Sequence, residues 1–317
     1  YIVGVIPFYQ QEYGIDGARI DMGHALPATL IREILTKVRA GDPHFIFWSE
    51  EFSAENAGAA REGGFDFITG SLWHLYKYHR AAGFQRKLLR ESWAAELPVA
   101  AAPETADTPR FACRFGDKRL GELLLMLNYF LPNTVPFINN GLELAEIQPM
   151  NLGLDNTEEG RFVLEATDPL YGKLAFFDRY RLHWLNPDRD WMEELLAKAA
   201  RLRGLFIHTL AAKENFLPEI SCSVKDKKLL FLCYRLRLPE EPAAEGEDGS
   251  RLFFLANKNL EEPVGIILGE LLASGGKTNI SKVKVVYAHG EERDEEWPAG
   301  DGWELAPGEV VIGYTLP

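Results

Sequence analysis

The feature of this sequence that most constrains its fold is an alternation of short apolar segments with longer amphipathic ones. Five short segments rich in Val, Ile, Phe or Ala occupy residues 14–21, 44–48, 65–70, 98–102 and 134–139. Between and after them, apolar residues recur at helical spacing over residues 27–39, 120–131 and 191–210. Strand-then-helix repeats predict an α/β fold with a parallel sheet and helical crossovers. The periodicity alone fits a doubly wound sheet and part of a (β/α)8 barrel equally well.

The pattern changes near residue 218. From there the sequence contains short apolar segments and turn-forming residues, without a convincing helical pattern. Residues 220–224 and 229–237 flank a polar turn and are expected to pair as a hairpin, and further strands are expected at residues 252–256, 264–268, 283–288 and 310–314. We therefore predict an α/β region over residues 1–217 and an antiparallel β-sandwich domain over residues 218–317.

The composition restricts the partners. Among 317 residues there are 34 Lys and Arg against 47 Asp and Glu, a net charge of −13. Nucleic acid is disfavoured because phosphate binding requires clustered Lys and Arg, and no apolar run approaches the ~18 residues of a membrane span. The 3 cysteines suit a reducing compartment, which favours the cytoplasm. The chain starts at Tyr1 without a basic leader, which leaves open whether a signal peptide precedes it.

Acidic residues terminate several of the predicted strands. Arg19 and Asp21 lie two apart at the end of the first strand, Glu50 and Glu51 end the second, and Asp107 follows the fourth. The carboxyl ends of parallel strands meet at one edge of a sheet, where barrel enzymes place their active sites. Two carboxyl groups about 5–5.5 Å apart are the minimum machinery of a retaining glycosidase. The alternative is chance, because with 47 acidic residues strand ends often carry one.

The amino-acid sequences of four segments resemble conserved regions of the α-amylase superfamily, glycoside hydrolase family 13. In chain order they are GIDGARIDMGHALP, FIFWSEEF, PETADTPR and TVPFINNGLELAE, and they are similar to that family's strand-four, strand-five, strand-seven and strand-eight regions. The resemblance covers about residues 1–217. It implies the second half of a (β/α)8 TIM barrel, about strands 4–8, followed by the family's C-terminal sandwich.

The resemblance assigns catalytic roles residue by residue. Asp21 would be the nucleophile, and Arg19 would keep it ionised and aimed. Glu50 would be the acid/base, with Glu51 as its rival; Glu50 is preferred because Ser49 fits the small residue that the family places before the acid. Asp107 would stabilise the oxocarbenium-like transition state.

Further residues are candidates for substrate binding. Besides Arg19, they are His24, Trp48, Trp73, His74 and Arg110. His24 would face the acceptor subsite, and the aromatic residues past the strand ends would stack on sugar rings. The alternative for each is structural, namely hydrogen bonding for His24 and helix packing for the aromatic residues. The family's usual His before the third carboxylate is replaced here by Ala106, which implies altered sugar binding.

The segments RIDMGHALP and PETADTPR look most like the maltosyltransferase-type members, so we expect maltosyl or 4-α-glucan transfer between malto-oligosaccharides. The alternatives are an α-amylase-type hydrolase of α-1,4-glucans, and a non-catalytic glycan-binding subunit or inactive fragment. The carboxylate chemistry needs no cofactor. Many family members hold a structural Ca²⁺, but no dense Asp/Asn cluster indicates one here.

The family's first region, on strand three, has no match in this sequence. Residues 1–13 are expected to form the helix before strand four, so the N-terminal half of the barrel is expected to be missing. An open half-barrel would expose an unpaired edge and part of a core. The missing half would belong to the same gene product, to a second chain, or to a second copy, in that order of preference. This chain alone is expected to be inactive.

Overall fold

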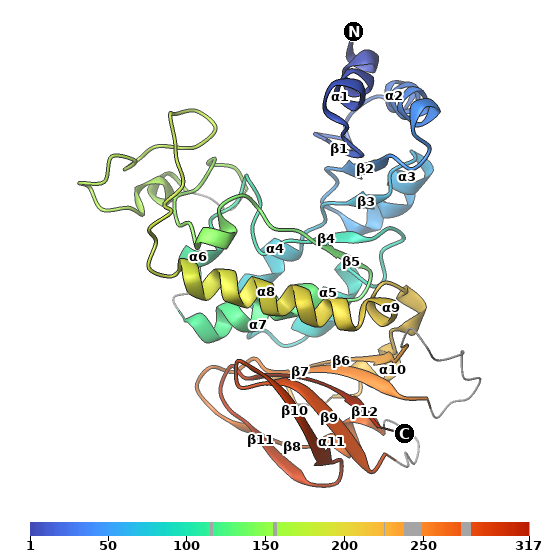
Figure 1. Cartoon of the computed structure of the whole chain (residues 1–317), viewed down its shortest axis with the longest axis vertical. Coiled ribbons are helices and arrows are strands. Elements are labelled where there is room, and N and C mark those ends of the chain that lie inside the picture. The colour runs from blue at the N-terminus through green and yellow to red at the C-terminus, as the bar shows by residue number, and fades with distance from the viewer. Residues whose placement is uncertain (115–116, 155–156, 225, 238–248, 274–279, 317) are drawn as a thin grey trace.

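The computed structural model describes residues 1–114, 117–154, 157–224, 226–237, 249–273 and 280–316 (Figure 1). Its first 217 residues alternate strands and helices. The strands are β1 (Gly17–Ile20), β2 (Ile46–Ser49), β3 (Phe67–Ile68), β4 (Val99–Ala101) and β5 (Thr134–Pro136). The α-helices are α1 (Val5–Tyr13), α2 (Ala28–Gly41), α3 (Ala57–Glu62), α4 (Leu72–Leu75), α5 (Phe84–Glu91), α6 (Phe111–Arg114), α7 (Lys118–Phe130), α8 (Arg189–Leu205) and α9 (Ile207–Leu210). Single 3-10 turns connect them: η1 (Ile2–Gly4), η2 (Ala54–Asn56), η3 (Tyr76–Tyr78), η4 (Leu142–Leu144), η5 (Glu158–Phe162) and η6 (Lys213–Asn215).

The five strands form one parallel sheet in the order β1-β2-β3-β4-β5. Each strand coincides with one of the five apolar segments that the sequence marks, with β2 ending one residue beyond its segment, so the α/β fold with a parallel sheet is confirmed. The register aligns Arg19 with Trp48 and Trp48 with Phe67. Because side chains alternate between the faces of a sheet, these three residues point to the same face.

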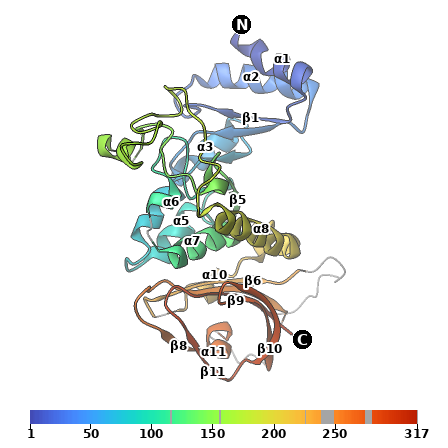
Figure 2. The same cartoon turned by 60° about the vertical axis from the view of Figure 1, so that its left-hand side comes forward.

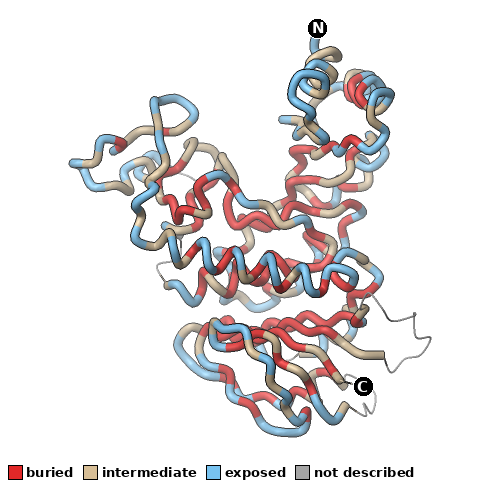
Figure 3. The backbone as a smooth tube through the Cα atoms, viewed as in Figure 1, coloured by how far each residue is buried: buried red, intermediate tan, exposed pale blue. Residues whose placement is uncertain are grey.

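The two faces of this sheet differ in burial. Phe47, Ile68 and Val99 point to one face and are fully buried in a core shared with α2 and α7. On the opposite face, which carries Arg19 and Trp48, Ile46 is 46% exposed and Val135 is 40% exposed. We call this second face the inner face. It exposes apolar side chains in the described structure. Figure 3 shows how burial varies along the backbone, with the buried residues in red.

Helix α7 packs between the rest of the α/β region and the C-terminal sheet (Figures 1 and 2). The Asp117 side chain caps its first turn by accepting a hydrogen bond from the Arg119 backbone N–H at 2.9 Å. Almost every residue from Leu120 to Phe130 is buried, because the helix packs against neighbours on several sides. The predicted helix over residues 191–210 is instead two helices, α8 and α9, which are interrupted at Phe206.

The C-terminal part contains β6 (Leu229–Arg235), β7 (Arg251–Asn257), β8 (Val264–Ile267), β9 (Lys282–Ala288), β10 (Glu291–Pro298), β11 (Gly302–Leu305) and β12 (Val310–Thr315). These form a five-stranded antiparallel sheet, β10-β9-β12-β7-β6, and a two-stranded sheet, β11-β8. Side chains of both sheets share a second core that includes Phe231, Leu255, Val285 and Leu305.

Three expectations for this part are wrong. Residues 220–224 do not pair with β6 as a hairpin, because the short helix α10 (Pro218–Ser221) begins there, with proline at its N-terminus. A second short helix, α11 (Leu268–Leu272), follows β8. Strands β10 and β11 were not expected either. The β10 sequence EERDEEWP is highly charged, and this strand lies at the edge of its sheet, where charged side chains reach solvent.

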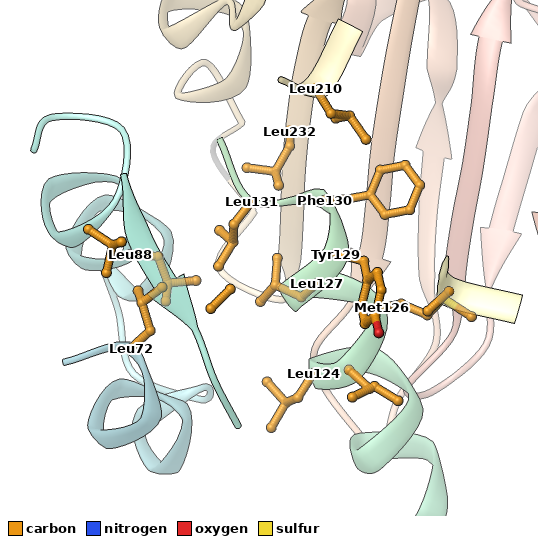
Figure 4. Packing of buried hydrophobic residues seen from close by; sticks show 14 of the residues in the cluster. Leu72, Leu88, Leu124, Met126, Leu127, Tyr129, Phe130, Leu131, Leu210 and Leu232 are labelled. Carbon is orange, nitrogen blue, oxygen red and sulfur yellow. The ribbon is translucent and has the colours of Figure 1, made fainter. Parts of the chain in front are cut away.

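The main core runs continuously from the α/β region into the C-terminal sheet. One face of the five-stranded sheet packs under α7 and α8 (Figure 2). Leu127, Phe130 and Leu131 lie beside Leu232 of β6 and Leu210 of α9 (Figure 4). The buried Tyr234 hydroxyl donates a hydrogen bond to the Phe130 carbonyl across this junction.

Between η4 and α8 the chain makes a long irregular excursion that protrudes from the molecule (Figure 1, green to yellow). We call described residues 150–154 and 157–188 the excursion. It follows the segment that leaves the carboxyl end of β5 and passes through η4. None of the helices in the described part of the chain has the length and apolar character needed to cross a bilayer.

Candidate active site

Arg19 brings two of the predicted catalytic carboxylates together at the carboxyl ends of β1 and β2. Its Nη1 donates to Asp21 Oδ1 at 2.8 Å, and its Nη2 donates to Glu50 Oε1 at 2.5 Å. The Asp21 side chain is 75% exposed, whereas that of Glu50 is 8% exposed. One guanidinium therefore joins an open carboxylate to a sheltered one.

Glu50 and Glu51 are separated by the alternation of the strand. Glu50 lies on the inner face with Trp48, and its second oxygen accepts the Met22 backbone N–H at 2.7 Å. Glu51 points away from this face, and its two oxygens accept the Ser53 backbone N–H at 2.7 Å and the Asn56 side-chain amide at 3.1 Å. Of these two glutamates, it is Glu50 that forms the ion pair with Arg19.

His24 lies behind Glu50. Its Nδ1 bonds to the Glu50 backbone carbonyl at 2.6 Å, which requires this ring nitrogen to be the donor. His24 also lines a cavity of about 500 Å³ between α2 and α3, together with Glu51 and Phe65. In this structure His24 supports the backbone of the β2 end, which is the structural alternative that the sequence left open.

Trp48 lies at the centre of an aromatic group on the inner face. Its ring stacks on Phe67 at a centroid distance of 5.2 Å and meets Phe137 edge-on at 5.0 Å. Its indole Nε1 donates to Thr69 Oγ1 at 3.0 Å, and the Arg19 guanidinium carbon lies 5.7 Å from the ring centroid. Trp48 therefore adjoins the paired carboxylates.

Trp73 and His74 lie on the short helix α4 that follows β3. Trp73 is buried, and the two rings meet edge-on at a centroid distance of 5.5 Å. His74 also contacts the ring of Tyr78 at 5.6 Å. For Trp73, burial corresponds to the packing alternative rather than to an open platform for a sugar.

The loop after β4 carries Asp107 and is held by a buried ion pair. Arg110 is 1% exposed, and its Nη1 donates to Glu104 Oε1 at 2.8 Å. The same guanidinium donates to the backbone carbonyls of Asn140 and Gln148 at 2.7 and 2.9 Å. Arg110 therefore braces the loop from inside and does not reach the solvent, unlike the direct substrate contact expected from the sequence.

Asp107 itself accepts a hydrogen bond from the Asn151 side-chain amide at 2.8 Å. Its backbone N–H donates to Thr105 Oγ1 at 3.2 Å. Asp107 is thus held between its own loop and the start of the excursion. Among the described residues, no hydrogen bond or ion pair joins Asp107 to Arg19, Asp21 or Glu50.

Sequence reasoning missed two buried carboxylates. Glu104 accepts bonds from Arg110, the Asn139 amide and the Phe111 backbone N–H. Glu146 accepts bonds from the Gln148 and His183 backbone N–H groups and from His183 Nδ1, which lies 2.8 Å away. Burial acts to raise the pKa of Glu146, but these hydrogen bonds outweigh it and hold the pKa below its usual value. The sequence feature that could have indicated a role for Glu104 is its place in the PETADTPR segment, three residues before Asp107.

The other ring nitrogen of His183, Nε2, lies 3.6 Å from Asp168 Oδ2. His183 therefore lies between Glu146, which precedes the excursion, and Asp168 within it. Burial and the neighbouring Glu146 carboxylate raise the pKa of Tyr180. Within the described residues, no group of three or more His, Cys, Asp or Glu side chains is arranged to hold a metal ion.

Solved structures of similar fold are α-amylases and related enzymes. They include Eubacterium rectale Amy13B, with a TM-score of 0.66 and 10% identity over 100% of this chain and 62% of that one. The α-amylase from Geobacillus thermoleovorans, solved with acarbose, has a TM-score of 0.65 and 14% identity over 100% and 63% of the two chains. The maltogenic α-amylase AmyB from Thermotoga neapolitana has a TM-score of 0.64 and 14% identity over 100% and 65%.

The chain thus spans less than two thirds of the length of each of these three structures. No family model matches the sequence. No curated protein is significantly similar to it. At these identities the likeness concerns the fold, and the described residues have the fold of part of an α-amylase structure.

Proposed function

We propose that this chain is part of an α-glucan-active enzyme that works by double displacement with retention of configuration. The observation that carries this proposal is the pair of carboxylates, Asp21 and Glu50, that meet on one guanidinium at the carboxyl ends of neighbouring parallel strands. The order of the four sequence motifs and the α-amylase fold of the structural neighbours support the substrate class. The most specific form of the proposal is maltosyl or 4-α-glucan transfer between malto-oligosaccharides.

In the proposed mechanism, the open Asp21 carboxylate attacks the anomeric carbon of the donor sugar. The bond to the leaving glycosidic oxygen breaks, and that oxygen takes a proton from Glu50. An acceptor hydroxyl then loses its proton to Glu50 and attacks the same carbon, which releases Asp21 and restores both carboxyl groups to their starting states. Asp107 binds sugar hydroxyls of the distorted ring.

Arg19 has a defined part in this cycle. A general acid must carry a proton, so the contact between Arg19 and Glu50 has to open when the sugar enters. The guanidinium then remains hydrogen-bonded to Asp21 and orients the nucleophile. Glu50 is preferred over Glu51 because Glu51 is occupied by Ser53 and Asn56 on the other side of the strand.

We further propose that additional parallel strands close over the inner face as a (β/α)8 barrel, and that residues 218–317 form a β-sandwich domain. The exposed Ile46 and Val135 support closure, since a finished barrel buries such side chains. The closing strands would come from the same gene product, a second chain or a second copy, in that order of preference. The 3 cysteines are all free thiols, which agrees with the cytoplasmic location that we propose.

Incubation with maltotetraose tests the activity. The protein, made with whatever sequence its gene encodes upstream of Tyr1, is incubated while chain lengths are followed by chromatography and reducing ends by a colour assay. Longer and shorter chains without a rise in reducing ends are the expected result and indicate transfer. A steady rise in reducing ends would instead establish the α-amylase-type hydrolase, which the names of the structural neighbours favour. The Asp21→Asn variant is the control and should do neither.

If binding of the glucan is measurable but no product forms, the proposed catalysis is wrong. The non-catalytic glycan-binding subunit would then be the better account of this chain.

A further inference from the structure

We propose that Asn151, the second residue of the excursion, is a positioning residue for Asp107. This inference rests on the proposed function, because that function makes Asp107 the carboxylate that contacts the sugar in the transition state. It goes further by assigning a role in the reaction to a residue outside the sequence motifs. It also makes the excursion a part of the active site.

The orientation of the Asn151 amide is fixed by two hydrogen bonds. Its Oδ1 accepts the Leu152 backbone N–H at 2.7 Å, and its Nδ2 donates to Asp107 Oδ1 at 2.8 Å. A backbone N–H can only donate and an ionised carboxylate can only accept, so exchanging the amide oxygen and nitrogen would break both bonds. Asn151 therefore presents a donor to Asp107.

The Asp107 loop is joined at two points to residues 148–151, where the excursion begins. Asn151 reaches Asp107 at one point, and Arg110 Nε donates to the Gln148 carbonyl at 2.9 Å at the other. In both segments the joined residues are three positions apart. Two such connections restrict rotation of the Asp107 loop relative to the sheet, which is the kind of support that a catalytic side chain requires.

Gln148, two residues before the excursion, connects the Asp107 loop to later parts of the excursion. It is fully buried, and its side-chain amide donates to the carbonyls of Arg161 at 2.8 Å and Lys173 at 2.6 Å. The position of Asp107 is therefore connected to residues far along the excursion. This connection runs through hydrogen bonds to backbone atoms.

Gly153 holds Asp107 from a second side. A Cβ atom at Gly153 would lie 2.9 Å from Asp107 Cβ, closer than real Cβ atoms approach their neighbours, and a tight 3.0 Å from the Asp107 backbone carbonyl oxygen. The excursion can pack this closely on Asp107 only because residue 153 lacks a side chain. Any larger residue there would displace Asp107.

The chemical consequence follows from which oxygen is engaged. The Asn151 amide donates to Oδ1 of Asp107 and carries no charge, so it orients the carboxylate without placing a second charge beside it. Loss of the amide should misorient this carboxylate in the transition state more than it weakens binding of the ground state. That predicts a loss in kcat with little change in KM.

The test compares three variants of the protein, each made with its upstream sequence, on maltotetraose. Asn151→Ala should lower kcat about tenfold and leave KM within about twofold, as expected for losing one hydrogen bond to a charged group. Asn151→Asp has the same shape but places a second carboxylate on Asp107, so kcat should fall further. Gly153→Ala should also lower kcat. Gly41→Ala is the matched control, because a Cβ at Gly41 meets nothing within 4 Å.

A second measurement does not depend on activity. Amide hydrogen exchange of residues 104–108 should accelerate in Asn151→Ala and Gly153→Ala, and it should stay unchanged in Gly41→Ala. If wild-type protein turns over maltotetraose and both Asn151 variants keep its kcat, the inference is wrong. If wild-type protein is inactive on α-glucans, the proposed function fails. In that case, amide hydrogen exchange of residues 104–108 that is the same in wild type and in the Asn151 and Gly153 variants would overturn the positioning role as well.

Discussion

The proposed chemistry depends on three side chains in contact, Arg19, Asp21 and Glu50. These side chains come from two strands, and their contacts follow from the register that aligns Arg19 with Trp48, two residues before Glu50. The exposed Asp21 is accessible to a sugar, whereas the sheltered Glu50 is kept within reach of a leaving group.

Replacement of these carboxylates tests their separate roles. Asp21→Asn should lower kcat about 10⁴-fold or more, because it removes the nucleophile. Glu50→Gln should lower kcat about 10²–10⁴-fold, the usual contribution of a general acid–base group. Glu51→Gln should retain most of the activity. Initial rates on maltotetraose measure all three, and a larger loss in Glu51→Gln than in Glu50→Gln would reverse the assignment.

The buried pair of Glu104 and Arg110 should matter for stability. Both side chains are almost completely inaccessible, and removing one partner leaves a buried charge without compensation. Arg110→Met should therefore lower the free energy of unfolding by about 3–5 kcal/mol. Urea denaturation measures this change. A loss below about 1 kcal/mol, the value typical of an exposed pair, would contradict the burial of Arg110.

Hydrogen bonds between Glu146, which lies before the excursion, and His183 within it hold the excursion against the rest of the chain. The pKa of Glu146 is held below its usual value in the folded chain, so its ionised form adds stability above the unfolded pKa of about 4.3. This contribution is lost as the pH falls through the lowered folded pKa.

The Glu146→Gln variant tests this linkage. At neutral pH it should be less stable than wild type by about 1–3 kcal/mol, because the buried hydrogen bonds to His183 and Gln148 are weakened. The difference should shrink as the pH falls through the lowered folded pKa of Glu146, where the wild-type side chain also becomes protonated. Urea denaturation at a series of pH values gives this curve. A difference that stays constant with pH would contradict the proposed ionisation.

The elements also show what the sequence can and cannot predict. The parallel strands were predictable because each is a short apolar segment buried on at least one side, and so were the carboxylates at the ends of β1 and β2. Strand β10 was not, since its Glu-rich sequence forms a strand only by pairing with β9 at a sheet edge. The contact between Asn151 and Asp107 joins residues 44 positions apart through an irregular excursion, and no local pattern indicates it.

In the molecule as a whole, the hydrophobic core is continuous across residue 217, where the sequence predicts a domain boundary. Leu127 and Phe130 of α7 share one buried cluster with Leu232 and Phe254 of the C-terminal sheet. The two regions that the sequence distinguishes are therefore expected to stabilise each other. The boundary itself stays a prediction.

A shared core predicts that both regions unfold together. Circular dichroism at helical wavelengths reports mainly on residues 1–217, and fluorescence of Trp297 and Trp303 reports on the C-terminal sheets once the other tryptophans are replaced by phenylalanine. The two probes should give the same midpoint in urea, as expected for one cooperative transition. Separate midpoints would indicate that residues 218–317 fold independently.

The most direct test of the central claim is to trap the covalent intermediate on Asp21. In Glu50→Gln protein made with its upstream sequence, α-maltosyl fluoride can still react, because fluoride leaves without a proton from Glu50, whereas the second step lacks its base. Mass spectrometry of the digested protein should find one maltosyl unit on the peptide containing Asp21, and none in the Asp21→Asn/Glu50→Gln double variant. A maltosyl unit on Glu51 or Asp107, or no adduct despite turnover of maltotetraose by wild-type protein, would contradict the account.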